Sequence, residues 1–242
     1  MKYRQSELFA NPFASVVFRR GLLGGLFCLG LMAGSWVRAA EWETLFAEGG
    51  LSAWKTYGQP ADSAVKWVAE AGVLAWRKGA GDLATRETFA DFELELEWKI
   101  SPGGNSGVMF GVDEAGRRPW HSGPEIQVVD DAKSRDGKKD LTAAGALYSL
   151  YAPAVPAAKP AGEWNALRLK VQGGRVQSWL NGLAVIDATI GSADWQQRVA
   201  ASKFAPFPQF ARVTSGRILL QDHGDPVWFR LIRIRRLSQV IF

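Results

Sequence analysis

Cysteine and histidine are scarce in this chain of 242 residues, which contains one cysteine, Cys28, and two histidines, His121 and His223. Because Cys28 lies in the amino-terminal segment, residues 40–242 contain no cysteine and cannot form a disulfide bridge. Helical periodicity is lacking too, since beyond residue 39 no stretch of about 12 or more residues repeats its apolar positions with a helical period. The sequence therefore predicts a β-rich fold whose core is large enough to be stable without disulfides.

The first 39 residues differ in composition from the rest of the chain. Arg19 and Arg20 precede a glycine-rich apolar stretch, and Val37 and Ala39 occupy the positions of a cleavage site. A membrane-spanning helix needs about 18 or more consecutive apolar residues, and Arg38 closes this run too early. We therefore expect residues 1–39 to be a signal peptide, and residues 40–242 to form one exported domain, periplasmic or extracellular, with no membrane attachment.

The positive charge of the chain is concentrated in that segment. Residues 1–39 hold five basic residues and one acidic residue, so their removal lowers the formal net charge from +5 to +1. We therefore expect no nucleic-acid partner, because a phosphate-binding surface requires a basic patch that stays on the mature protein.

Apolar and polar residues alternate with period two along most of residues 40–242, which is typical of half-buried strands. The stretch FELELEWKI, from Phe92 to Ile100, predicts one core face and one face of glutamates exposed to water. Asn181-Gly182 is a strong hairpin signal, because both residues tolerate a positive φ. The one helix we expect is short, around Ser192 to Arg198, with Ser192 as its cap. Many short strands predict a sandwich of two antiparallel sheets.

Two polar stretches interrupt this pattern. In GPEIQVVDD, Glu125 and Gln127 share one strand face, about 7 Å apart, and they predict a polar wall lining a cleft. In LLQDHGDPVWF, the turn requires only Gly224, Asp225 and Pro226, so the residues Gln221, Asp222 and His223 need another explanation. Asn105 and Trp120 lie in Gly-rich or Pro-containing loops, where they are candidates for the rim of a binding site.

The ordered segments NSGVMF, GPEIQVVD, GALYSLYAP, GEWNALRLKV, WLNG and GRILLQDHGDPVWFRLIRIRRL resemble the secreted domain family long called DUF1080, now described as 3-keto-disaccharide hydrolases. The resemblance spans nearly all of residues 40–242. Leu231 departs from it, because the family usually has Asn there, and Ser178 stands where a His is frequent. The resemblance implies a concanavalin A-like jelly-roll sandwich. It also implies an oxidised oligosaccharide or glycoside substrate, produced upstream by a glycoside 3-oxidoreductase.

A ketone at C3 acidifies the C2 hydrogen of such a sugar, so that the glycosidic bond can break by elimination and water can then add to the enone. This route needs a base, an acid for the leaving group and a stabiliser for the enolate. We predict Glu125 and His223 as the catalytic acid–base pair without deciding between the two roles. The predicted substrate-binding residues are Gln127, Gln221, Asp222, Asn105, Trp120, His121 and Asp130.

No cofactor is certain from the sequence, but a divalent metal is left open. The residues that could converge on one ion are His121, His223, Glu125, Asp130 and Asp222. None of their spacings is diagnostic of a metal site.

Two other functions compete with this one. A retaining glucanase would need a second carboxyl about 5 Å from Glu125, and Asp130 has a spacing from Glu125 that resembles the glucanase pattern. A non-catalytic carbohydrate-binding module is the alternative from another class, because the sandwich fold also serves lectins.

Overall fold

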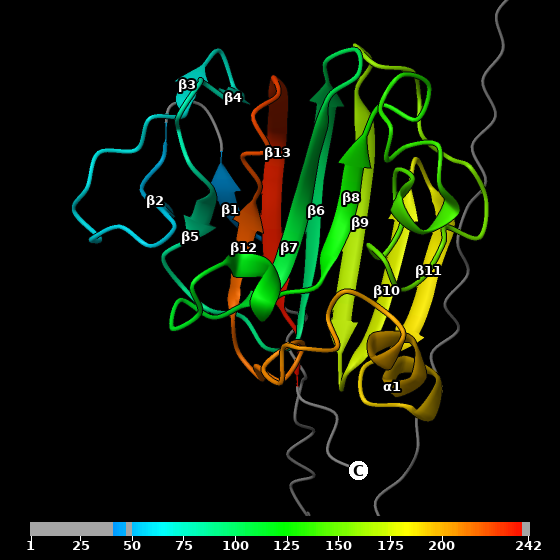
Figure 1. The fold of residues 1–242 in the computed structure, drawn as a ribbon. Helices are drawn as coiled ribbons and strands as arrows, with labels where there is room; N and C mark the ends of the chain where they lie inside the picture. Colours follow the sequence, from blue (N-terminus) through cyan, green and yellow to red (C-terminus); the bar gives the residue numbers. More distant parts are fainter. Residues whose placement is uncertain (1–40, 47–49, 239–242) are drawn as a thin grey trace, which may run out of the picture. The chain divides into compact units, whose positions relative to one another are not determined.

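The computed structural model describes residues 41–46 and 50–238, and the predicted signal peptide lies outside this part of the chain. In the described residues, two antiparallel sheets pack face to face, which confirms the predicted fold class (Figure 1). Only one helix of more than one turn occurs there, and no helix among the described residues has the length and apolarity needed to span a membrane.

The larger sheet has eight strands in the order β11-β10-β9-β6-β13-β4-β3, with β1 also paired to β13. Its strands are β1 (Glu43–Phe46), β3 (Val68–Glu70), β4 (Val73–Ala75), β6 (Phe92–Ile100), β9 (Asn165–Gln172), β10 (Arg175–Leu180), β11 (Leu183–Thr189) and β13 (Val227–Arg236).

The smaller sheet has five strands in the order β2-β5-β12-β7-β8. Its strands are β2 (Trp54–Thr56), β5 (Leu83–Thr85), β7 (Asn105–Val112), β8 (Glu125–Val129) and β12 (Arg217–Leu220). Short 3-10 turns at Pro119–His121 and Asp140–Thr142 lie in the connections that follow β7 and β8.

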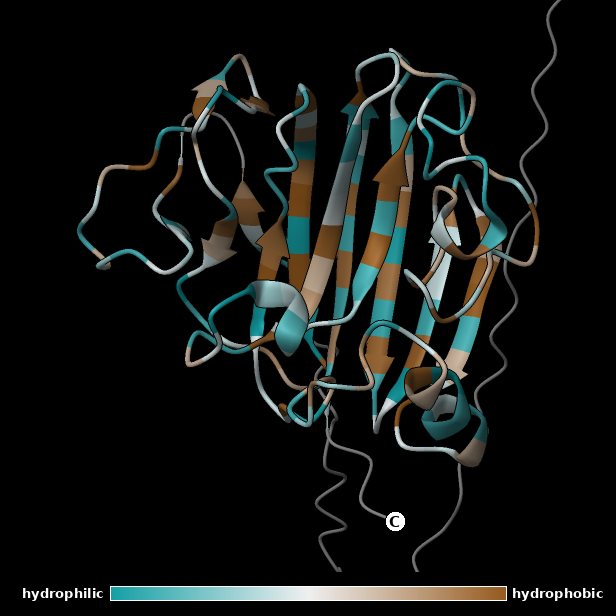
Figure 2. Cartoon of the chain, viewed as in Figure 1, coloured by the Kyte–Doolittle hydropathy of each residue, from teal (hydrophilic) through white to brown (hydrophobic). Residues whose placement is uncertain are grey.

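The core lies between the two sheets and follows the period-two pattern of the sequence. Figure 2 shows this pattern as alternating hydrophilic and hydrophobic bands along the long strands. Leu94, Leu96 and Trp98 of β6 are fully buried in one cluster with Val108 of β7 and Ile126 of β8. Because alternate side chains of a strand point to opposite faces, Glu125 and Gln127 of β8 face away from Ile126 and this core.

The predicted local elements are confirmed. The hairpin at Asn181-Gly182 joins β10 to β11, with φ values of 51° and 82° at its two residues. The helix α1 (Ala193–Ala200) begins after Ser192, whose hydroxyl accepts a hydrogen bond of 3.2 Å from the backbone N–H of Trp195.

The predicted water-facing row of glutamates on β6 is corrected by the structure. Glu93 is only 1% exposed, because the side chains of Arg168 and Arg235 hydrogen-bond to it from the two neighbouring strands. Burial acts to raise the pKa of Glu93, but the two arginines outweigh it and hold that pKa below its ordinary value. This face of the sheet is therefore a ladder of ion pairs rather than a row of freely solvated carboxylates.

Candidate active site

The outer face of the five-stranded sheet carries a row of residues that begins at Lys55 on β2 and ends at Glu125 on β8. The strand registers place Ala84, Leu219 and Met109 between them. These three residues are fully buried, and Tyr57 and Trp120 pack against them from the loops. The outer face of this sheet is therefore covered over much of its area rather than open to water.

Gly107 on β7 creates the space that Glu125 occupies. A Cβ atom placed on Gly107 would lie 2.0 Å from Oε1 of Glu125, much closer than any van der Waals contact allows. Gly107 pairs with Gln127 on β8, and its carbonyl accepts a hydrogen bond of 2.9 Å from the backbone N–H of Gln221. Glu125, Gln127 and Gln221 thus surround Gly107, and we call this group the Gly107 cradle.

The carboxyl of Glu125 is buried in the cradle, and within the described chain it has no hydrogen-bond partner. Burial raises the pKa of Glu125 to about 8. The charge of Lys203 opposes this shift, whereas the charges of Asp82 and Asp136 add to it. A carboxyl with this pKa holds its proton at neutral pH and can donate it.

The side-chain amides of Gln127 and Gln221 in the cradle, and of Asn105 beside it, have polar atoms without a hydrogen-bond partner in the described chain. Neither the oxygen nor the nitrogen of the Gln127 side chain has a hydrogen bond within the described residues, although Gln127 is only 1% exposed. The side-chain oxygens of Gln221 and Asn105 are also buried without a partner there. Buried polar groups in proteins are nearly always paired, so a cluster of unpaired amides indicates a place for ligand hydroxyls.

Aromatic rings and one lysine lie on the loops that cover this region. Trp120 meets both His121 and Phe207 edge to face, at centroid distances of 4.3 and 4.9 Å, and His121 stacks on Phe207 at 4.1 Å. Nζ of Lys203 lies 4.1 Å from the ring centroid of Tyr148, whose backbone N–H donates to the carbonyl of Glu125. The predicted residues Trp120 and His121 thus belong to an aromatic cover.

β8 is an end strand of its sheet, yet all five of its residues are buried. Gly145, Ala146 and Tyr148 form backbone hydrogen bonds with Glu125 and Gln127, so the segment after β8 folds back along its free edge. This stretch is therefore not a solvent-facing edge strand.

His223 lies in the loop between β12 and β13 and is exposed. Its charge acts on Asp82, and the charge of Asp82 acts in turn on Glu125. No hydrogen bond or ion pair joins His223 to Glu125 in the described structure, and Asp82 lies within electrostatic reach of both. Their pairing as acid and base stays a prediction.

Asp222 and Asp130 use their carboxylates within the protein. Asp222 accepts hydrogen bonds from the Trp76 indole at 2.5 Å and from the backbone N–H of Gly81 at 2.8 Å. Asp130 accepts them from the backbone N–H groups of Gly103, at 2.7 Å, and Ala132, at 3.0 Å. Both residues hold loops in place, and their predicted contacts with a sugar stay predictions.

The strand register argues against the glucanase alternative. The pairing of β7 with β8 runs without a register shift, so Asp130 lies on the opposite side of the strand from Glu125. The structure also gives no support to the metal hypothesis, because no three His, Cys, Asp or Glu residues of the described chain are grouped so that they could hold an ion. The five residues that could have converged on one ion therefore do not form such a group.

Asp82 is a site residue that the sequence analysis missed. It immediately precedes β5, and its Oδ1 accepts a hydrogen bond of 2.8 Å from the backbone N–H of Asp222. Burial raises the pKa of Asp82 to about 6 despite the opposing charges of Arg118 and His223. The only local signal for Asp82 in the sequence is its place after Gly81 at the start of a strand. The sequence analysis also did not identify Arg118 and Lys203 as site residues.

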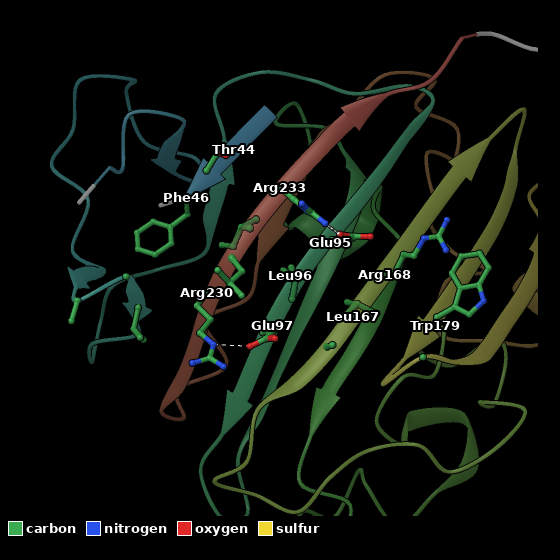
Figure 3. Close-up of a pocket in the computed structure, with 17 residues that line it drawn as sticks. Thr44, Phe46, Glu95, Leu96, Glu97, Leu167, Arg168, Trp179, Arg230 and Arg233 are labelled. Carbon is green, nitrogen blue, oxygen red and sulfur yellow. Dashed lines mark hydrogen bonds and ion pairs between the residues drawn. The ribbon is translucent and has the colours of Figure 1, made fainter. Parts of the chain in front are cut away.

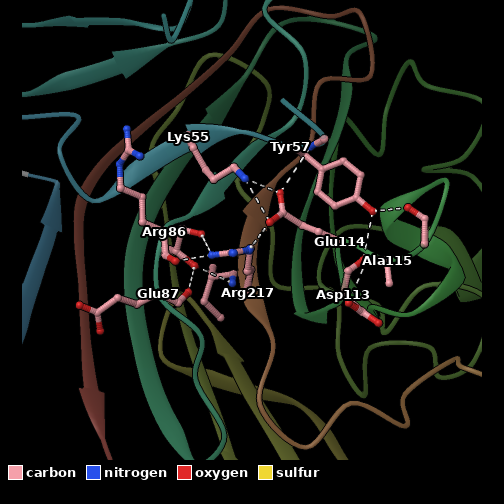
Figure 4. A network of polar contacts seen from close by, with 12 residues as sticks. Lys55, Tyr57, Arg86, Glu87, Asp113, Glu114, Ala115 and Arg217 are labelled. Atoms are coloured by element: carbon pink, nitrogen blue, oxygen red, sulfur yellow. Dashed lines mark hydrogen bonds and ion pairs between the residues drawn. The ribbon is translucent and has the colours of Figure 1, made fainter. Parts of the chain in front are cut away.

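A polar network at the far end of the same sheet holds the loop that follows β7 (Figure 4). Glu114 binds Lys55 of β2 at 2.8 Å and Arg217 of β12 at 2.8 Å. The hydroxyl of Tyr57 donates to the backbone carbonyls of Asp113 and Gly116 at 3.1 and 2.9 Å. The loop that carries Arg118 and Trp120 is thereby tied to β12, to β2 and to Tyr57, which directly follows β2.

A broad groove of about 1190 Å³ lies on the outer face of the larger sheet. Figure 3 shows its ion pairs across neighbouring strands, with Arg230 bound to Glu97 and Arg233 bound to Glu95. Arg168, which also lines it, is paired with Glu93. Because its charged side chains are already paired, whereas the amides of the Gly107 cradle are not, we assign the candidate active site to the cradle.

Known proteins resemble this chain in sequence and in fold. Residues 41–235 match the family model of the 3-keto-alpha-glucoside-1,2-lyase-like domain. A 3-keto-disaccharide hydrolase from Bacteroides thetaiotaomicron is 33% identical over 234 residues, which cover 84% of this chain and 80% of that relative.

Two crystal structures of Parabacteroides distasonis proteins with provisional glycosyl hydrolase assignments resemble the chain. The first has a TM-score of 0.76 at 31% identity, covering 81% of this chain and 94% of that one. The second has a TM-score of 0.63 at 28% identity, covering 81% and 100% respectively.

Proposed function

Because the chain belongs to the 3-keto-alpha-glucoside-1,2-lyase-like domain family, we propose that it cleaves the glycosidic bond of 3-keto glycosides by elimination followed by hydration. The observation that carries this proposal is the Gly107 cradle, in which a buried carboxyl lies among unpaired amides. The family membership supports a glycoside-cleaving enzyme, and the cradle offers one proton-transfer carboxyl and amides that can bind sugar hydroxyls.

The chemistry begins at C2 of the sugar. A base removes the C2 proton that the neighbouring ketone has acidified, and the electron pair forms an enolate. The enolate then expels the oxygen at C1, which takes up a proton as it leaves. Water adds to C1 of the resulting enone and a proton returns to C2, so that the net reaction is hydrolysis.

The cradle fits these steps in three ways. The carboxyl of Glu125 supplies one proton-transfer group, and His223 remains the partner that the sequence predicts. The amides of Gln127 and Gln221 are free to bind the hydroxyls of a pyranose ring. Lys203 brings a positive charge toward Glu125, where it favours negative charge that develops on the substrate.

A matched pair of substrates tests the proposal. The protein should release the leaving group from a 3-keto-glucoside but not from the parent glucoside, because only the ketone acidifies the C2 hydrogen. Glu125→Gln should slow this release about a hundredfold or more when the leaving group is an alkoxide, which needs a proton. Cleavage of both substrates at equal rates would show a conventional glycosidase, and binding without cleavage would show a carbohydrate-binding module.

The substrate also implies a preceding reaction. A glycoside with a ketone at C3 arises by oxidation of the C3 hydroxyl, so we propose a glycoside 3-oxidoreductase as the upstream enzyme.

A further inference from the structure

We propose that Asp82 is the second proton-transfer carboxyl of this site, that it removes the C2 proton, and that Glu125 protonates the leaving oxygen from the other side of the Gly107 cradle. This inference rests on the proposed function and assigns the roles that the sequence left open. It gives His223 the different task of stabilising the charge of Asp82.

The strand registers place Asp82 on the correct face. β5 pairs with β12 through Leu83 with Leu220 and Ala84 with Leu219, so the next position aligns Asp82 with Gln221. Asp82 also shares the outward face of Ala84, because the two residues are two positions apart.

The same row continues from Gln221 to Gly107 and Gln127. Three strand spacings separate Asp82 from Gln127, a Cα distance of roughly 14 Å, and Glu125 lies two residues along β8 from Gln127 on the same face. Asp82 and Glu125 therefore stand on opposite sides of the glycine, with the unpaired amides between them. A sugar held by these amides would lie between the two carboxyls.

The charges around each carboxyl differ in a way that suits the two roles. Arg118 and His223 face Asp82 and favour its ionised form, although Asp222 is also close. Glu125 faces Lys203, but burial and the charges of Asp82 and Asp136 favour its protonated form. With pKa values of about 6 and about 8, Asp82 is ionised and Glu125 is protonated at neutral pH. Two carboxyls whose environments separate their pKa values are a common arrangement for a base and an acid.

The proton balance closes with these two groups alone. Asp82 takes the C2 proton, the C1–O bond breaks, and Glu125 gives its proton to the departing oxygen. Glu125 is then ionised and takes a proton from the water that adds to C1, while Asp82 returns its proton to C2. Both carboxyls end in their starting states.

Two leaving groups separate the roles experimentally. 4-Nitrophenolate departs without a proton, whereas an alkoxide needs one. Glu125→Gln should therefore lose at least a hundredfold in kcat with a methyl 3-keto-glucoside but less than about tenfold with the 4-nitrophenyl compound. Asp82→Asn should lose at least a hundredfold with both substrates, because C2 deprotonation precedes either departure.

A second readout isolates the base. In D2O, the native protein and Glu125→Gln should exchange the C2 hydrogen of a 3-keto C-glycoside, whose C1 substituent cannot leave, and Asp82→Asn should not. Asparagine can still accept the hydrogen bond from Asp222, so the loop should keep its structure. Asp187→Asn is the matched control, since this exposed carboxylate pairs with Arg175 on the other sheet.

The outcomes distinguish the two proposals. If the native protein neither cleaves nor exchanges, the proposed function fails. If the native protein is active, Asp82→Asn stays within threefold of it and His223→Gln loses a hundredfold, only the assignment of Asp82 is overturned. The sequence-predicted pair of Glu125 and His223 then stands.

Discussion

Glu125 shows how one residue depends on the absence of another side chain. Its carboxyl occupies the space above Gly107, where no β-carbon is tolerated, and this burial gives it a pKa of about 8. A carboxyl whose folded-state pKa lies above its unfolded value of 4.5 favours folding less as pH rises between the two values. Below pH 4 both states are protonated, so the cost is absent, and above pH 8 it is constant.

Glu125→Gln should therefore be more stable than the native protein at pH 8, by about 2 to 5 kcal/mol, and equally stable at pH 4. The reason is that the amide keeps the shape of the protonated carboxyl but never ionises. Urea unfolding at a series of pH values measures this difference. A pH-independent difference would mean that Glu125 is ionised in the folded protein, and would remove the basis for its role as an acid.

The site was only partly predictable at the residue scale. Glu125 and Gln127 could be found because they break an apolar pattern on a single strand. Asp82 could not, since its importance comes from the pairing of β5 with β12, which joins residues about 140 positions apart. His223 drew attention because histidine is rare here, but the structure exposes its side chain.

At the element scale, β13 has a bulge where it changes partners. It pairs with β4 up to Arg230 and with β1 from Ile232, and the register with β6 shifts between these positions. Leu231 lies at the change, with a φ of 52° and 63% of its surface exposed. Asparagine adopts this left-handed conformation more readily than leucine does. The family's usual asparagine at this position therefore has a conformational reason.

Leu231→Asn should stabilise the protein by about 0.5 to 1 kcal/mol, because it relieves backbone strain and removes an exposed apolar side chain. Leu183→Asn is a matched control, since Leu183 is 52% exposed but lies on a strand without a positive φ. Thermal and urea unfolding of both variants measure the effect. An equal gain at both positions would mean that the loss of an exposed apolar side chain, and not the relief of strain at the bulge, stabilises the protein.

The strands and their turns could be predicted because their signals are local. Alternation marked β6, and Asn181-Gly182 marked the hairpin of β10 and β11. The cover of the smaller sheet could not be predicted, because Glu114 and Lys203 reach it from loops with no regular pattern. The ion-pair ladder at Glu93 was missed for a different reason, since its arginines lie on β9 and β13, whose pairing with β6 joins residues far apart in the sequence.

At the scale of the whole molecule, the folded domain has to be stable without disulfides, so its stability depends chiefly on the sandwich core. Residues 40–242 contain no cysteine, and the core cluster joins side chains from both sheets. We propose that residues 1–39 direct export and are removed, which places this domain in a compartment where many proteins rely on disulfides.

The exported protein should therefore begin at Ala40 and unfold identically with and without a thiol reductant. Removal of the segment should also lower the isoelectric point well below 9.4, because the formal charge falls from +5 to +1. Mass spectrometry of the exported fraction identifies the amino terminus, and urea unfolding with and without dithiothreitol measures the stability. Residues 40–242 produced without the segment serve as the control and should give the same unfolding curve. An exported protein that retains residues 1–39 in the membrane fraction would show an anchor instead, and the cleavage proposal would be wrong.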